Sequence, residues 1–190
     1  MEILNWRTYQ EKIDRLPTSD DLKPYWKRSY KSRWCYFKEI INEINKLTNG
    51  IDNPKILELG AFCINFTDVS DNIDININYI DYDNVHNEIY IMDLREEKRW
   101  DIPDKHYDLV IASQIFEHLE GHQLFTFNEI KRVSKKAIIT IPYKWNSPND
   151  KMHHNITTDH FDKWTDNFMF NEQYAVRCNN LLRLFRIYEF

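Results

Sequence analysis

Glycine is scarce in this chain of 190 residues, which contains only three. Gly60 follows a short apolar run within Lys55–Phe62 and is the turn residue expected where a parallel strand meets a nucleoside-like ligand. The positions after it hold Phe62 and Ile64. A pyrophosphate-binding loop would carry further glycines there, so that backbone amides could contact the phosphates. The scarcity of glycine therefore weighs against a nicotinamide dinucleotide enzyme.

Cysteine is equally sparse, with Cys35, Cys63 and Cys178 scattered along the chain. An odd number at irregular spacing predicts neither a disulfide framework nor a cysteine-based metal site. We therefore expect a reducing, cytoplasmic setting.

Long apolar runs are missing, and the first residues lack the charged-then-apolar pattern of a signal peptide, so we expect no membrane segment. The net charge of −5 argues against a protein that binds nucleic acid over its whole surface. The length favours a single domain, residues 1–190, and the sequence leaves its oligomeric state open.

What is present is an alternation of apolar strands and helical patterns. Residues 34–47 have apolar side chains at helical spacing, followed by the stop signal Asn49-Gly50. Further helices are expected over 124–133, with Leu124 facing inward, and near 159–169. Five strands are expected before the tail, at Ile56–Leu59, Tyr79–Asp83, Glu88–Leu94, Tyr107–Ser113 and Lys136–Ile141, the last ended by Pro142. Two closing strands are expected between Tyr174 and Phe190.

These elements predict an α/β fold, namely a Rossmann-like, doubly wound and mostly parallel sheet with an antiparallel C-terminal edge. Only residues 84–87 separate the second strand from the third. A full crossover needs about a dozen residues. The connection between strands two and three is therefore expected to be shortened.

Taken together, the order of motifs from about residue 40 onward resembles the class I S-adenosylmethionine-dependent methyltransferases, especially the small-molecule branch of the methyltransferase type 11 kind. The resemblance rests on four motifs: Ile56-Leu57-Glu58-Leu59-Gly60, the acid Asp81, the acid Asp93, and the apolar strand 107–113 followed by Glu117-His118-Leu119. It implies S-adenosylmethionine as the cofactor.

The resemblance also implies roles for individual residues. Asp81 would accept hydrogen bonds from the ribose hydroxyls, which suits an ionised two-oxygen acceptor. Glu58 would order the loop under the methionine end, and Tyr82 would lie along the adenine. The remaining cofactor contacts would come from Gly60, Ala61, Phe62, Asp93, Leu94, Ser113, Gln114 and His118. For Asp93 a turn-forming role, for Glu58 a capping role and for His118 a structural role stay open.

The stretch 23–38 combines basic and aromatic side chains, and residues 1–38 could form an N-terminal lid over an anionic ligand. Tyr30 and Arg33, with Tyr143 beyond the fifth strand, are the predicted acceptor-binding residues. An amphipathic helix with a solvated basic face is the alternative.

The acceptor is expected to be a small molecule with a hydroxyl or amine, such as a nucleotide-linked or phosphorylated sugar used in polysaccharide biosynthesis. A hydroxyl acceptor needs a base, and His154, then His153, are the candidates because they stand on a polar loop without a packing role. No metal is expected, since His153, His154 and His160 have no cysteine pair or carboxylate cage beside them in the sequence. An RNA methyltransferase and a cofactor-free Rossmann-like binding module remain as alternatives.

Overall fold

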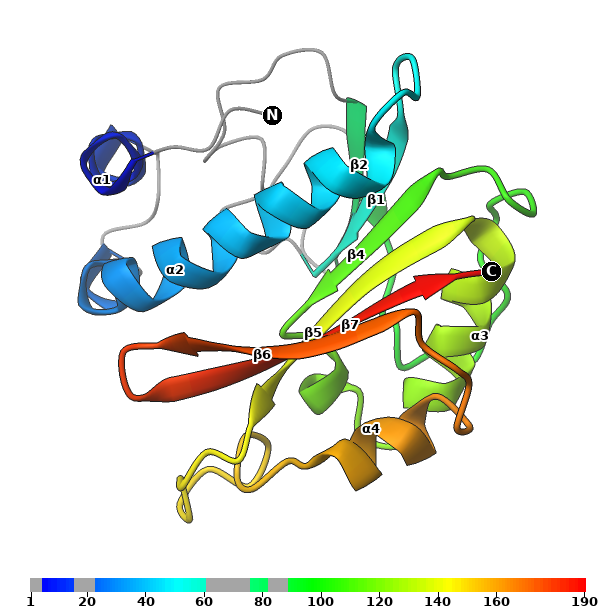
Figure 1. Ribbon diagram of the computed structural model, residues 1–190. Coiled ribbons are helices and arrows are strands. Elements are labelled where there is room, and N and C mark those ends of the chain that lie inside the picture. Colours follow the sequence, from blue (N-terminus) through cyan, green and yellow to red (C-terminus); the bar gives the residue numbers. More distant parts are fainter. Residues whose placement is uncertain (1–4, 16–22, 61–75, 82–88) are drawn as a thin grey trace.

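The computed structural model describes residues 5–15, 23–60, 76–81 and 89–190 (Figure 1). Its helices are α1 (Trp6–Arg15), α2 (Lys23–Thr48), the 3₁₀ turn η1 (Phe116–His118), α3 (Gln123–Val133) and α4 (Thr158–Trp164). Its strands are β1 (Lys55–Leu59), β2 (Asn76–Asp81), β3 (Ile89–Ile91), β4 (Leu109–Ser113), β5 (Lys136–Tyr143), β6 (Glu172–Cys178) and β7 (Leu181–Glu189).

All the strands lie in one sheet of order β3-β2-β1-β4-β5-β7-β6. The pairs from β3 to β5 are parallel, and β7 runs antiparallel to both β5 and β6. From β1 the chain builds outward to β2 and β3, then returns to place β4 on the other side of β1 and continues to β5. The expected doubly wound sheet with an antiparallel edge is therefore confirmed. Residues 82–88 join β2 to the parallel β3, and they are too few for a full crossover.

A hydrophobic core lies on each face of the sheet. On one face α2 packs its buried apolar stripe, including Ile40 and Ile44, against Ile56, Ile111 and Ile138 of the strands. On the other face α3 and α4 contribute Phe127, Ile130, Val133 and Phe161 (Figure 1). Because β4 is covered on both sides, it reads in the sequence as a nearly continuous apolar run.

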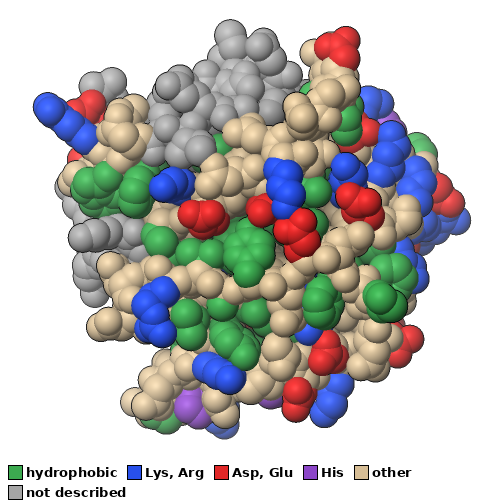
Figure 2. Space-filling model, viewed as in Figure 1, with side chains coloured by type: hydrophobic (Ala, Val, Ile, Leu, Met, Phe, Trp, Pro, Cys, Tyr) green, Lys and Arg blue, Asp and Glu red, His purple; other side chains and the backbone are tan. Residues whose placement is uncertain are grey.

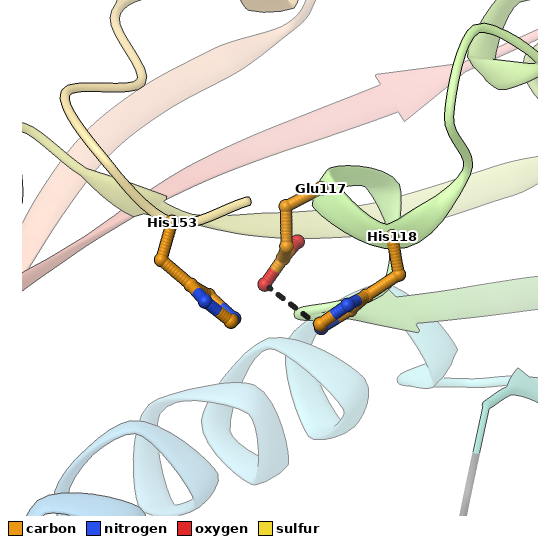
Figure 3. A group of neighbouring side chains, drawn as sticks. All are labelled: Glu117, His118 and His153. Atoms are coloured by element: carbon orange, nitrogen blue, oxygen red, sulfur yellow. Dashed lines mark ion pairs between the residues drawn. The ribbon is translucent and has the colours of Figure 1, made fainter. Parts of the chain in front are cut away.

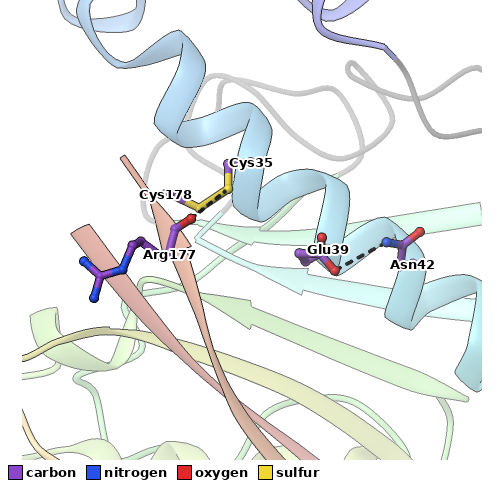
Figure 4. The surroundings of a disulfide bond; sticks show 5 residues. All are labelled: Cys35, Glu39, Asn42, Arg177 and Cys178. Atoms are coloured by element: carbon purple, nitrogen blue, oxygen red, sulfur yellow. Dashed lines mark hydrogen bonds between the residues drawn. A yellow bond between two sulfur atoms is a disulfide. The ribbon is translucent and has the colours of Figure 1, made fainter. Parts of the chain in front are cut away.

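A disulfide joins Cys35 of α2 to Cys178 at the end of β6, which corrects the expectation that the cysteines stay unpaired (Figure 4). The two residues are 143 positions apart, with their Cα atoms 5.6 Å from each other. The pairing could not be read from spacing, because it exists only where α2 crosses the antiparallel edge of the sheet.

Two other expectations need correction. β5 continues through Pro142 to Tyr143, because β4 ends opposite Thr140 and leaves Pro142 with β7 as its neighbour. A residue without an N–H group is tolerated where a strand has one side unpaired. Leu124 is 41% exposed, because the first turn of α3 turns Gln123 inward instead, where its amide donates to the carbonyl of Phe116.

No helix among residues 5–15, 23–60 and 89–190 is long and apolar enough to span a membrane. The face shown in Figure 2 carries several exposed hydrophobic side chains interspersed with acidic and basic ones.

Candidate active site at the carboxyl edge of the sheet

Three of the residues that the sequence singles out lie at the carboxyl ends of the parallel strands. In the sheet register Leu59 lies between Ile80 of β2 and Ala112 of β4. Gly60, Asp81 and Ser113 each come one position later and therefore share one edge. The strand order reverses between β1 and β4, and open α/β sheets bind ligands in the crevice at such a point.

Gly60 is the point at which the chain leaves β1, with a φ of 65°. A Cβ atom added there would lie 2.6 Å from Cδ1 of Ile115, a residue of the segment that follows β4. The positive φ favours glycine, and a side chain at this position would force the end of the Ile115 side chain to shift. Gly60 and the turn after β4 therefore lie directly against each other.

The exit of β4 is fixed by hydrogen bonds to Thr140 of β5. The Ser113 hydroxyl lies 3.1 Å from the Thr140 hydroxyl, and Nε2 of Gln114 donates to the same oxygen at 3.1 Å. Gln114 has a φ of 55°, which is unfavourable for a residue with a side chain. Such strain is typical of a position whose geometry matters for function.

Asp93 forms a compact ion pair with Arg95 after β3. Nη2 of Arg95 lies 2.7 Å from one carboxylate oxygen, and the backbone N–H of Arg95 donates to the other. These hydrogen bonds lower the pKa of Asp93 to about 2, so the group is ionised at neutral pH. Asp93 thus has the turn-forming role that the sequence left open. The next residue, Leu94, is buried, and its carbonyl accepts a hydrogen bond from the Thr126 hydroxyl.

The structure describes only some of the other predicted cofactor residues. Glu58 is buried within β1, and Asp81 is the last residue of β2. Ala61, Phe62 and Tyr82 lie outside the described residues.

Glu117, His118 and His153 come together beside this edge (Figure 3). Glu117 and His118 belong to η1 after β4, and His153 belongs to the loop after β5. Nε2 of His118 lies 4.0 Å from a carboxylate oxygen of Glu117, and the two imidazole rings are 5.0 Å apart. The Glu117 side chain is fully buried, and this burial raises its pKa to about 8.

Two neighbours hold His153 in place. Its Nδ1 lies 2.6 Å from a carboxylate oxygen of Asp150, and its ring stacks on the Trp145 indole at 5.7 Å. His154, the first candidate for the base, has a different environment. It is exposed, and its Nδ1 accepts the backbone N–H of Ser147 within the loop. The structure thus brings His153 to the cluster and leaves His154 outside it.

The predicted acceptor-binding residues lie on α2 and β5. Tyr143 is the last residue of β5, at the same edge of the sheet as Ser113. Arg33 donates to the hydroxyl of Tyr36, whose ring lies 5.1 Å from the guanidinium of Arg183. That guanidinium also stacks on Trp145 at 4.0 Å. Tyr30 lies in the first half of α2.

Glu117 is the site residue for which sequence reasoning assigned no role. Its carboxyl oxygens have no hydrogen-bond partner among the described residues, although the side chain is buried. The sequence contained a usable signal, because loops that follow adjacent parallel strands meet at one edge. Glu117 follows β4, and His153 follows β5.

The sheet order defines a doubly wound α/β fold whose switch point lies at the carboxyl edge, between β1 and β4. Solved structures identify the fold more closely. The chain is similar to a SAM-dependent methyltransferase from Archaeoglobus fulgidus, with 16% identity, 82% of this chain and 77% of that chain covered, and a TM-score of 0.60.

Two further neighbours show the range of the likeness. The N-methyltransferase NodS from Bradyrhizobium japonicum WM9 has 12% identity, 81% of this chain and 96% of that chain covered, and a TM-score of 0.57. The [4+2]-cyclase SpnF has 11% identity, 78% of each chain covered and a TM-score of 0.60. No family model and no curated protein matches the chain. The chain therefore has the class I fold of S-adenosylmethionine-dependent methyltransferases.

Proposed function

We propose that this protein is an S-adenosylmethionine-dependent methyltransferase that acts on a small acceptor bearing a hydroxyl or amine. The observation that carries the proposal is the junction of Gly60 and Ile115 at the switch point of a class I methyltransferase fold. SpnF shows that the fold also occurs in a protein titled a cyclase, so the reaction needs its own test.

The residues at this edge fit the cofactor that the fold suggests. Gly60 lets the backbone turn closely beneath a ligand, and Asp81 ends the neighbouring strand, where an acid can accept hydrogen bonds from vicinal hydroxyls. The ionised Asp93 adds a further acceptor next to β3. S-adenosylmethionine supplies an electrophilic methyl group that an acceptor lone pair displaces in line.

The chain's own contribution is to hold the acceptor close to the donor carbon, since positioning alone lowers the barrier of such a displacement substantially. Ser113, Gln114 and Tyr143 stand at the carboxyl ends of β4 and β5, where the acceptor would sit. Arg33 and Tyr30 on α2 support an anionic acceptor, such as a phosphorylated or nucleotide-linked sugar, and residues 1–38 would act as its lid.

A hydroxyl acceptor must lose a proton as the new bond forms. Of the two candidate histidines, His153 is better placed than His154, because it lies beside Glu117 and His118 instead of facing the loop backbone. We therefore assign the proton-accepting part of the site to the cluster that contains His153.

Calorimetry with S-adenosylhomocysteine tests the cofactor assignment. Asp81→Ala should weaken binding by about 1.5–3 kcal/mol, the range for hydrogen bonds to a charged group. Asp52→Ala is the matched control, since Asp52 is an exposed acid before the amino end of β1. Unchanged affinity in Asp81→Ala would contradict the assignment. Absence of binding by the wild type would favour a cofactor-free binding module.

A survey of acceptors follows if the cofactor binds. Phosphorylated and nucleotide-linked sugars should be methylated, and single His153→Asn and His154→Asn variants should separate the two histidines. We expect a loss of turnover in His153→Asn alone. Preference for RNA, with affinity that falls steeply as salt rises, would instead identify a nucleic-acid substrate.

A further inference from the structure

We propose that Glu117, His118 and His153 form a binding site for a divalent first-row transition metal. One ligand atom from each residue lies within 4.8 Å of the others, and the three side chains converge from η1 and from the loop after β5 (Figure 3). Two imidazoles and one carboxylate are the ligand set of many catalytic sites in which a metal keeps open positions.

The state of Glu117 is the observation that points to a ligand. A buried carboxyl group is ordinarily hydrogen-bonded, because burying it without a partner is costly. The Glu117 side chain has no exposed surface, and neither oxygen has a hydrogen-bond partner on another residue within the described part of the chain. Its side chain points toward the two imidazoles (Figure 3). A cation held between these groups would satisfy it.

The surroundings of His153 match those of a metal-binding histidine. Asp150 lies 2.6 Å from Nδ1, which leaves Nε2 available for a metal. Histidine ligands characteristically bond a carboxylate through their other nitrogen, which fixes the orientation of the ring. Stacking on Trp145 adds a second constraint on the same ring.

His118 presents its Nε2 to the same point. Its Nδ1 lies 3.3 Å from the sulfur of Met152, and its Nε2 is the atom nearest to Glu117. Metal–nitrogen bonds of about 2.1 Å place neighbouring ligand atoms about 3 Å apart. The side chains therefore need to move inward by about an ångström to close on an ion.

Charge in the neighbourhood is compatible with a bound cation. One neighbouring charge opposes a bound metal ion: the Arg183 guanidinium lies close enough to act on the charge of Glu117 and would repel the ion. Glu117 and Asp150 together supply two carboxylates, which offset the guanidinium and the ion in part. Nitrogen ligands favour zinc, iron, cobalt or nickel over magnesium, which prefers oxygen.

This site also suggests a role, which rests on the proposed methyltransferase function. A divalent ion at the ends of β4 and β5 would orient an acceptor oxygen and lower the pKa of its hydroxyl. His118 and His153 would then act as ligands, and the ion would make deprotonation possible near neutral pH.

Metal binding is measured directly on the full chain, treated with a chelator and freed of any affinity tag. Titration with Zn²⁺ in a calorimeter should show one site per chain, and Co²⁺ should produce a visible absorption band. Mg²⁺ should bind far more weakly. Equal binding of Mg²⁺, or no saturable binding of Zn²⁺, would overturn the proposal.

The variants assign the site. Glu117→Gln and His153→Ala should each abolish Zn²⁺ binding, and Asp150→Asn should weaken it by about 10–100-fold, as loss of an orienting partner does. Glu120→Gln, at an exposed residue, and His122→Ala, at a half-buried residue outside the cluster, are matched controls that should keep wild-type affinity. Circular dichroism verifies folding, and His153→Ala serves if Glu117→Gln fails to fold. Unchanged Zn²⁺ binding in His153→Ala would refute the site.

The two proposals fail separately. Binding of Zn²⁺ that depends on Glu117, without binding of S-adenosylhomocysteine, would keep the metal site and remove the methyltransferase function. Binding of S-adenosylhomocysteine by a protein that does not bind Zn²⁺ would keep the methyltransferase proposal and remove the metal site. If both bind, methyl transfer should stop in a chelator and return with the metal, while affinity for S-adenosylhomocysteine stays constant.

Discussion

Gly60 offers a sharp test at the scale of single residues, because two different effects exclude a side chain there. A positive φ costs a residue with a Cβ about 1–2 kcal/mol. The contact with Ile115 should add about 1 kcal/mol through overpacking. We therefore expect Gly60→Ala to lower the free energy of unfolding by roughly 2–3 kcal/mol, measured by urea denaturation.

Gly50 supplies the control for this prediction. Its φ is 80°, yet a Cβ added there would meet no atom within 4 Å. Gly50→Ala should therefore show the cost of the backbone alone. Ile115→Val removes the Cδ1 atom nearest to Gly60, so Gly60→Ala should cost less in that background. Equal losses in Gly50→Ala and Gly60→Ala would show that the contact with Ile115 is unimportant.

Asp93 predicts a specific dependence of stability on pH. Hydrogen bonds from Arg95 lower its folded-state pKa from 3.8 to about 2. A lowered pKa means that the ion pair stabilises the fold above about pH 4, and that this contribution disappears as the pH falls toward 2. The side chain is 34% exposed, so solvent screening keeps the effect at about 1 kcal/mol or less.

Asp93→Asn tests this dependence by removing the titrating group. The variant should be less stable than the wild type at pH 6, and the difference should shrink between pH 4 and 2.5. Urea denaturation at each pH measures it, and Asp101→Asn, which changes an exposed acid, is the control. A difference that stays constant across this range would contradict the shifted pKa.

At the scale of elements, a disulfide covalently links α2 to the antiparallel edge of the sheet. Cys35 and Cys178 close a loop of 143 positions. Removing a native disulfide typically costs about 2–5 kcal/mol, because the unfolded chain regains freedom. We expect Cys35→Ser, Cys178→Ser and the double variant to lose similar stability in thermal denaturation.

This equality is the signature of one bond, since the second substitution has nothing further to break. Additive losses would show that the two cysteines act separately, and a strong reductant should bring the wild type to the level of the variants. The bond also bears on the reducing, cytoplasmic setting expected from the sequence, because such a compartment would keep both residues as thiols.

The positions of most strands along the chain could be predicted from the sequence, because apolar runs and the turns after them are local features. Their alternation with helical patterns also indicates a doubly wound, mostly parallel sheet. The register that brings Glu117 to His153 could not be predicted, because it depends on which loops the sheet places together. The same limit applies to Cys35 and Cys178. The sequence places both His154 and His153 on one polar loop, and only the structure shows which of the two imidazoles reaches the cluster.

For the whole molecule, the likeness to solved methyltransferases establishes the arrangement of strands and leaves the reaction to the site. Identities of 11–16% in the neighbours described above come with TM-scores of 0.57–0.60. Function depends on side chains at the edge of the sheet, and those can change while the fold is kept. The experiments on Asp81 and Glu117 therefore carry more weight than a closer structural match would.

The strand order also has a consequence for the order in which the strand pairs form during folding. The β6–β7 hairpin joins neighbouring segments, whereas β1 pairs with β4 at Ile56 and Leu109. Pairing between distant segments is slow, because the entropy of closing the loop is lost before any contact forms. We expect the hairpin to assemble early and the β1–β4 pair late. The switch point lies between those two strands, so the ability to bind a ligand there would arise in the last step of folding.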